Sequence, residues 1–163
     1  MTTDDLEAVL AINELNTDDV GHLDADQLSG ILSDARIALV AIEPEGAIVG
    51  FCLVVDAGGG HHTPRAEWAL AAAHPDLHLE RVAFDMQYSG YGLGLALYEE
   101  LDRRIEGLAA DAPSGEIMLT SLVRLEPPND HAIGFHATRG FETVDQASFG
   151  DVTVGVAVKT FTT

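Results

Sequence analysis

The sequence has little positive charge. Its 163 residues contain 8 Lys and Arg against 27 Asp and Glu, for a formal net charge of −19, and Lys159 is the only lysine. An acidic surface of this kind repels phosphate backbones, so we expect no nucleic acid partner. Two explanations of the acidic balance stay open: attraction of a cationic amine substrate, and adaptation of the surface to solubility or high salt.

Cysteines and long apolar runs are also scarce. The single cysteine, Cys52, excludes an internal disulfide and lies in the apolar run IVGFCLVV, where it is expected to be a buried small hydrophobe. No stretch approaches the roughly 20 apolar residues of a membrane helix. The N-terminal segment MTTDDLEAVL is acidic and lacks a basic signal-like region. We therefore expect no membrane partner and a cytoplasmic location.

The length and the order of the apolar patterns favour one α/β domain over residues 1–163, with a mostly antiparallel sheet. The segment EPEG is a turn signal between two β-rich runs and predicts a hairpin. Apolar spacing predicts helices at 4–12, 26–35, 65–73, 92–108 and 127–139, and strands at 37–42, 47–55, 77–84, 116–125, 141–149 and 151–161.

A glycine-rich turn, SGYGLGLALYEEL (89–101), follows the strand at 77–84 and runs into a helical pattern. Glycines at this point let a ligand approach free backbone N–H groups at a helix N-terminus, which is an anion site. A Walker A loop is excluded because no lysine is present, and neither Gly90 nor Gly92 starts a G-x-G-x-x-G/A dinucleotide fingerprint. The alternative at this stage is a tight turn that only packs on the sheet.

Two segments carry a resemblance to a known family. The turn Ser89–Gly94 is similar to the Q/R-x-x-G-x-G/A turn of the GCN5-related N-acetyltransferase (GNAT) superfamily, and NDHAIGFHATRGF (129–141) is similar to its second signature, N-x-x-A-x-x-x-Y-x-x-x-G-F. The matching positions of the second signature are Asn129, Ala132, Gly140 and Phe141. The strand segment LERVAF (79–84) and the segment LEPPN (125–129) are similar to those of a bacterial or archaeal branch of predicted acetyltransferases. The resemblance covers roughly residues 4–160.

The resemblance implies an α+β fold with a mixed, mostly antiparallel sheet of about six strands, helices on both faces and a V-shaped split between the strands at 77–84 and 116–125. It implies acetyl-CoA as cosubstrate, bound in that split. The pantetheine arm would pair with the backbone of 82–84, the turn would bind the pyrophosphate, and two residues of the second signature would reach the cofactor. The implied cofactor-binding residues are Val82, Ala83, Phe84, Ser89, Gly90, Tyr91, Gly92, Leu93, Gly94, Asn129 and His136.

Three departures from the family pattern stand out. Ser89 replaces the usual Gln or Arg, and His136 replaces the Tyr that many members use to protonate the departing thiolate. The first helical pattern begins almost at the N-terminus, so the usual first strand is missing or very short. Either the sheet has one strand fewer, or the natural start lies upstream.

The expected chemistry is acetyl transfer to an amine by direct attack in a ternary complex. Glu80 is the first candidate for the general base and His78 the second, because residues two apart face one side of a strand. His136 is the candidate acid for the thiolate. Structural roles stay open for all three, including pairing of Glu80 with Arg81 or Arg124.

The acceptor is expected to be an amine on a small molecule or a protein, and the family pattern is compatible with a homodimer. No metal is expected, since the adjacent His61 and His62 lack further ligands at a suitable spacing. A non-catalytic module that binds or senses acyl-CoA is the alternative function, favoured by Ser89 and His136. A purely structural turn is the third reading.

Overall fold

In the computed structural model, which describes residues 1–60 and 63–163, six strands form one hydrogen-bonded sheet in the order β1-β2-β3-β4-β6-β5. His61 and His62 lie outside the described residues. The β3–β4 pair is parallel, and the β1–β2, β4–β6 and β5–β6 pairs are antiparallel. The expected mixed, mostly antiparallel sheet is therefore confirmed. The strands are β1 (Ala35–Ile42), β2 (Ile48–Asp56), β3 (Leu77–Phe84), β4 (Glu116–Glu126), β5 (Glu142–Phe149) and β6 (Val152–Thr162).

Each helix expected from apolar spacing is present, with ends that shift by a few residues. Two short elements were not expected, α2 and η2, because a single helical turn has too few residues to show a period. The helical elements are η1 (Thr3–Asp5), α1 (Leu6–Glu14), α2 (Thr17–Val20), α3 (Ala25–Asp34), α4 (Pro64–Ala73), η2 (Met86–Tyr88), α5 (Leu93–Asp111) and α6 (Asp130–Thr138). Within the described ranges, no helix has both the length and the apolar character needed to cross a bilayer.

The chain divides into two compact units. Residues 1–55 and 80–104 form unit 1, and residues 56–79 and 105–163 form unit 2. Strand β3 and helix α5 contribute residues to both units. That the whole chain acts as a single acetyltransferase domain stays a prediction.

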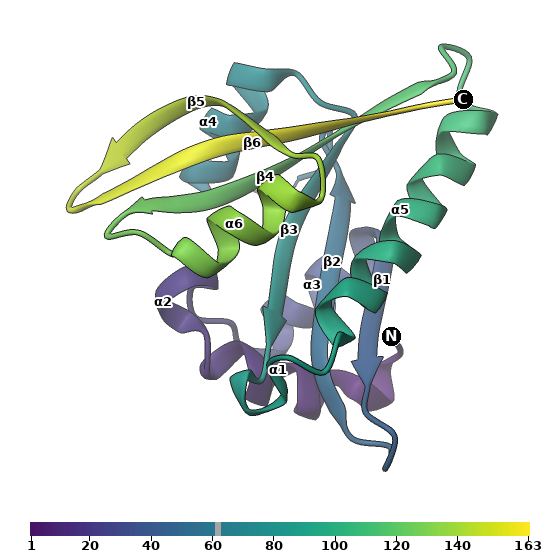
Figure 1. Ribbon diagram of the computed structural model, residues 1–163, viewed down its shortest axis with the longest axis vertical. Coiled ribbons are helices and arrows are strands. Elements are labelled where there is room, and N and C mark those ends of the chain that lie inside the picture. The colour runs from purple at the N-terminus through teal and green to yellow at the C-terminus, as the bar shows by residue number, and fades with distance from the viewer. Residues whose placement is uncertain (61–62) are drawn as a thin grey trace. The chain divides into compact units, whose positions relative to one another are not determined.

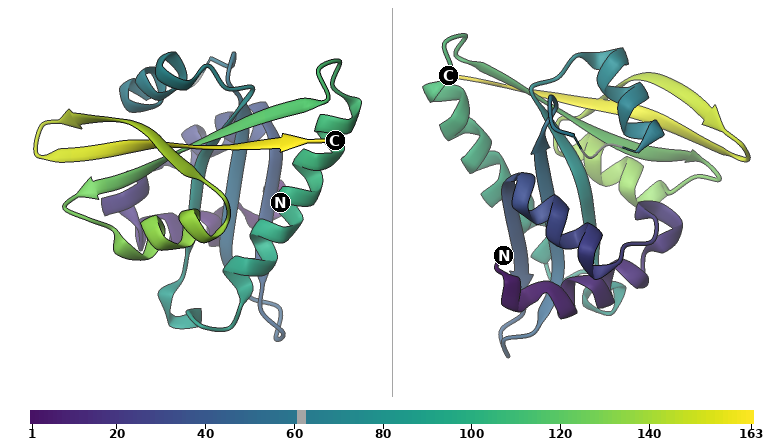
Figure 2. Two further views of the ribbon diagram at one scale, coloured as in Figure 1. Left: turned by 45° about the horizontal axis from the view of Figure 1, so that its top comes forward. Right: turned by 180° about the vertical axis from the view of Figure 1, so that it is seen from behind.

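Unit 1 is built on the β1–β2 hairpin, in which Leu39 lies opposite Cys52, as the EPEG turn predicted. Helices α1 and α3 cover one face of this hairpin, and the first part of α5 lies on the other face (Figures 1 and 2). Strand β2 is buried from Val49 to Val55, because a strand covered on both faces has no solvent side. Cys52 is fully buried, as expected, and burial raises the pKa of its thiol to about 12.

One apolar cluster holds the helices of unit 1 on the sheet. Val9 of α1 and Leu28 of α3 are fully buried together with Phe51 and Leu53 of β2. Ala83 of β3 belongs to the same cluster. The end of β3, from which the glycine turn departs, is therefore anchored in the core.

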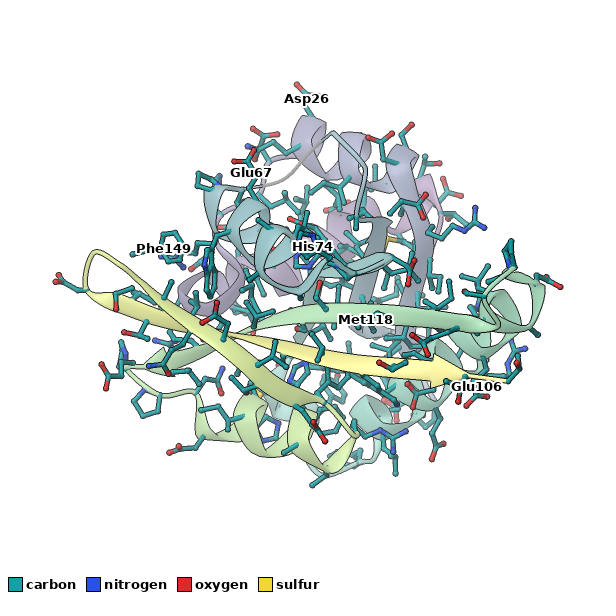
Figure 3. All side chains as sticks on the ribbon, turned by 90° about the horizontal axis from the view of Figure 1, so that it is seen from above. Asp26, Glu67, His74, Glu106, Met118 and Phe149 are labelled. Atoms are coloured by element: carbon teal, nitrogen blue, oxygen red, sulfur yellow. The ribbon has the colours of Figure 1, made fainter. Side chains whose placement is uncertain are left out.

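In unit 2, strands β4, β6 and β5 form an antiparallel layer with α4 and α6 on opposite sides (Figures 1 and 3). The parallel pairing of β3 with β4 runs from Leu77 opposite Leu119 to Leu79 opposite Ser121. The expected split between these strands would open beyond this last pair, and the split itself stays a prediction. Phe149 at the end of β5 lies against α4, where its ring meets that of Trp68 at 5.8 Å (Figure 3).

Gly50 on β2 gives unit 1 a close contact that requires glycine. A Cβ atom at this position would overlap the ring of Phe84, the last residue of β3. We expect Gly50→Ala to displace Phe84 and to lower the free energy of unfolding by about 1–3 kcal/mol. Urea unfolding would measure the change.

Gly30→Ala is the matched control, because Gly30 lies in α3 and nothing lies within 4 Å of an added Cβ atom. This variant should be neutral or stabilising by up to about 1 kcal/mol, since alanine is the better helix former. Equal stabilities of the Gly50→Ala variant and the wild type would contradict the proposed steric constraint.

Candidate active site

The glycine turn joins β3 to α5 through positive backbone angles. Gly90 has a φ of 86° and Gly92 a φ of 77°, a region that L-residues rarely adopt. Just before the turn, Asp85 caps the N-terminus of η2, because its side chain accepts a hydrogen bond of 2.9 Å from the N–H of Gln87. Of the six residues of the predicted phosphate turn, Ser89 to Gly92 connect η2 to α5, and Leu93 and Gly94 are the first two residues of α5.

The backbone N–H groups of this turn are placed to bind an anion. The N–H of Ala96 donates to the carbonyl of Gly92 at 3.0 Å, so the helical ladder starts there and the N–H groups before it have no intrahelical acceptor. Residues Ser89 to Gly92 are exposed. The positive end of the dipole of α5 lies at the same point. The turn can thus bind a phosphate group through its backbone alone.

The predicted pantetheine segment, Val82 to Phe84, forms the last part of β3. Ala83 is buried, whereas Val82 and Phe84 are half-buried. The carbonyl of Phe84 accepts a hydrogen bond of 3.0 Å from Nδ2 of Asn16. Pairing of a pantetheine arm would therefore use other backbone groups of this segment.

Arg81 makes a buried network that sequence reasoning missed. One nitrogen, Nη1, donates to Oδ1 of Asn13 at 3.0 Å and to the carbonyls of Val20 and Gly21 at 2.6 and 3.1 Å. Asn13 is fully buried and its Nδ2 donates to the carbonyl of Gly21 at 2.9 Å. The network ties the α1–α2 segment to β3. Its only sequence signal was an asparagine on the buried side of the first helix.

Glu80, the first candidate base, lies on β3 immediately before Arg81. It is half-buried, and burial raises the pKa of its carboxyl group from 4.5 to about 7, while the charge of Arg81 acts in the opposite direction. A carboxyl group with this pKa exchanges its proton near neutral pH, which suits a general base. Glu80 and the glycine turn both belong to unit 1.

His78, the second candidate base, belongs to unit 2 and is almost fully buried. Its Nδ1 lies 3.0 Å from Oγ1 of Thr120 on β4. The hydroxyl of Thr120 donates to the carbonyl of Leu77, so its oxygen accepts the proton on Nδ1. These bonds link β3 to β4 and favour a structural role for His78.

His136 and Asn129 lie on the second signature, in unit 2. Asn129 caps α6, because its Oδ1 accepts the N–H of Ala132 at 3.0 Å. Nδ1 of His136 lies 2.9 Å from the carbonyl of Ala132, and Nε2 lies 3.4 Å from Oγ of Ser121. A carbonyl only accepts, so Nδ1 donates.

The protonation of His136 follows from these bonds. With the proton on Nδ1, the neutral ring accepts the hydroxyl proton of Ser121 at Nε2. Burial lowers the pKa of His136 below its ordinary value of 6.5. At neutral pH the ring is therefore mostly neutral, and an acid role would depend on a small imidazolium population.

The described residues form no group of three or more His, Cys, Asp or Glu side chains that could hold a metal ion. The glycine turn is the chemically distinctive feature of unit 1. A strand–turn–helix of this kind suits a class of protein that binds a phosphate-bearing ligand at a helix N-terminus.

Comparison with known families supports that class. The Acetyltransferase (GNAT) family matches residues 10–141, and the chain belongs to this family. It is thus an acyltransferase, with acetyl-CoA as the acyl donor that the family uses. Comparison with curated protein sequences found no significant match.

Solved structures share the fold over nearly the whole chain. The ribosomal-protein-S18-alanine N-acetyltransferase from Escherichia coli has a TM-score of 0.71 at 16% identity and covers 100% of this chain and 92% of its own. Naa20 from Chaetomium thermophilum, in complex with a bisubstrate analogue, has a TM-score of 0.68 at 19% identity, with coverage of 99% and 84%. An aminoglycoside 6'-N-acetyltransferase complexed with coenzyme A has a TM-score of 0.67 at 13% identity, with coverage of 94% and 89%.

A larger side chain in the glycine turn should obstruct acetyl-CoA binding without unfolding the protein. Gly94 lies in the first turn of α5 and has no positive φ, whereas valine at Gly92 would also strain the backbone. We expect Gly94→Val to weaken acetyl-CoA binding at least about tenfold by calorimetry, because the Cβ atom and its methyl groups obstruct approach to the N–H groups. Gly107→Val, on the same helix, should bind normally, and equal affinities of the two variants would contradict a phosphate site at this turn.

The raised pKa of Glu80 should make stability depend on pH. The folded state holds a proton that the unfolded state releases, so the stabilisation is complete below about pH 4.5 and is lost as pH rises towards 7. We therefore expect the free energy of unfolding of Glu80→Gln, measured relative to wild type, to increase over this range. Glu99→Gln, at an exposed position of α5, should show no such trend, and a flat difference for Glu80→Gln would contradict the raised pKa.

Proposed function

We propose that the protein transfers an acetyl group from acetyl-CoA to an amine by direct attack in a ternary complex, with Glu80 as the general base. The observation that carries this proposal is the position of Glu80, half-buried on β3, the strand that leads into the glycine turn. Burial there raises the pKa of its carboxyl group to about 7. The base must exchange a proton near the working pH, and few carboxyl groups do so without such a shift.

Each residue has a defined task in this reaction. Glu80, as a carboxylate, takes a proton from the ammonium group of the acceptor, directly or through one water, and the neutral amine that results attacks the thioester carbonyl. Backbone N–H groups in the segment from Val82 to Phe84 stabilise the oxyanion that forms on the thioester carbonyl. The N–H groups of Gly90 to Gly94 hold the pyrophosphate, whereas the N–H of Ser89 donates to the carbonyl of Met86 at 3.1 Å. Asn129 lies on the second signature, where we propose a further cofactor contact.

For protonation of the departing thiolate, the candidate acid His136 is mostly in its neutral form at neutral pH. His136 can supply a proton only as the imidazolium, and its lowered pKa keeps that form scarce at neutral pH. We therefore propose that His136 contributes as an acid only in acidic solution and that solvent protonates the thiolate at neutral and higher pH.

We propose that the acceptor is a cationic amine, on a small molecule or on a protein. The formal charge of −19 attracts cations over the whole surface. Solved structures of the same fold whose names include a ribosomal protein alanine and an aminoglycoside illustrate both kinds of acceptor. A homodimer remains part of this proposal.

Release of free CoA from acetyl-CoA in the presence of a panel of amines tests the function. With a working acceptor, we expect kcat/KM to rise with pH through about 7 in the wild type, and the limb due to Glu80 to disappear in Glu80→Gln with at least a tenfold loss above pH 7. Glu99→Gln is the matched control. Tight binding of acetyl-CoA without transfer to any amine, at any pH, would instead support a non-catalytic acyl-CoA-binding module.

A further inference from the structure

The phosphate turn is surrounded by negative charge and has no cation of its own. Between Val82 and Asp102 the sequence contains no Lys or Arg. It contains four carboxylates there, at Asp85, Glu99, Glu100 and Asp102. The turn and the first part of α5 thus offer a phosphate backbone N–H groups, the helix dipole and neutral hydroxyl groups, with no side-chain cation.

The basic side chains of unit 1 are held elsewhere or paired. Arg103 and Arg104 both bond to Glu100, at 2.8 and 2.7 Å. Arg81 is buried and donates to the α1–α2 segment. Unit 1 has four Arg, the fourth being Arg36 on β1, against sixteen Asp and Glu.

Two opposing forces therefore act on an anionic cofactor. The N–H groups and the dipole attract phosphate, and this attraction falls off within the first turn of the helix. Carboxylates spread over the surface repel it over longer distances, but salt shortens that range from about 10 Å at 0.1 M to about 3 Å at 1 M. Added salt should remove the distant repulsion while hydrogen bonds at contact distance are screened much less.

We propose that acyl-CoA binds this turn more tightly as ionic strength rises, so that the site is suited to a strongly screened medium. This inference rests on the proposed function and names the condition under which the cofactor site works. It reverses the usual behaviour of phosphate sites built from Lys and Arg, whose affinity falls with salt.

The test is acetyl-CoA affinity, measured by calorimetry between about 0.1 M and about 1 M NaCl, with circular dichroism to verify an equal folded fraction. We expect the dissociation constant to fall at least about threefold over this range. Acetyl-pantetheine, which lacks the phosphates, serves as the charge-free probe and should show a much smaller change. An equal change for both probes would assign the effect to apolar burial and overturn the proposal.

A matched pair of variants tests whether the lack of a cation at the turn causes the salt dependence of acetyl-CoA affinity. Ser89→Arg places a guanidinium at the turn, whereas Ser29→Arg makes the same change at an exposed position of α3. We expect Ser89→Arg to bind acetyl-CoA more tightly at low salt and to lose the rise in affinity with salt, and Ser29→Arg to behave like the wild type. Retention of the full salt effect in Ser89→Arg would overturn the proposal.

The outcomes separate this inference from the proposed function. Acetyl-CoA binding that weakens with salt in the wild type overturns the inference and leaves the acetyltransferase function intact. Absence of acetyl-CoA binding at every salt concentration contradicts the proposed function itself.

Discussion

The connection from β3 into α5 depends on two glycines with positive φ, and the chemistry proposed for this protein depends on the backbone they expose. Gly90 and Gly92 reverse the chain without a steric penalty, so that the N-terminus of α5 points its free N–H groups at one place. The fold supports this turn from behind. Ala83 lies in the apolar cluster of unit 1, and the ring of Phe84 fills the space that a side chain at position 50 would need.

Burial has different consequences for two adjacent ionisable residues on β3, Glu80 and Arg81. Arg81 keeps its charge near the core because Nη1 donates to three acceptors at Asn13, Val20 and Gly21, although its buried Nε has no hydrogen-bond partner among the described residues. The bonds of Nη1 fix the α1–α2 segment against β3. For Glu80, burial outweighs the attraction of Arg81, so the carboxyl group holds its proton up to about pH 7. Arg81 therefore holds the α1–α2 segment in place, and Glu80 has the proton affinity that a general base requires.

Sequence patterns predicted the six strands, the longer helices and the glycine turn, because each has a local cause: apolar period, turn residues or a motif. The second signature made the turn specific to a family. Contacts between residues far apart in the sequence could not be predicted from these local patterns. Nothing local shows that Gly50 lies under Phe84, that Arg81 bonds to α1–α2, or that Ser121 donates to His136. Burial also decided proton affinities, which is why the pKa values of Glu80 and His136 move in opposite directions although both were chosen as catalytic candidates.

The acidic surface affects the binding of both the cofactor and the acceptor. The segment from Val82 to Asp102 contains no Lys or Arg, so backbone dipoles are the main attraction that the turn itself offers a phosphate. The same charge favours an amine acceptor that arrives as a cation. Donor and acceptor would then respond to salt in opposite directions, because one is repelled and the other attracted by the same surface.

Amide NMR spectra recorded during an acetyl-CoA titration test the role of the turn most directly. We expect the backbone amide signals of residues 90–95 to shift most, since their N–H groups would bond to the pyrophosphate, and acetyl-pantetheine to leave them unchanged. Shifts concentrated elsewhere in the chain, with the signals of 90–95 unmoved by acetyl-CoA, would contradict a phosphate site at this turn.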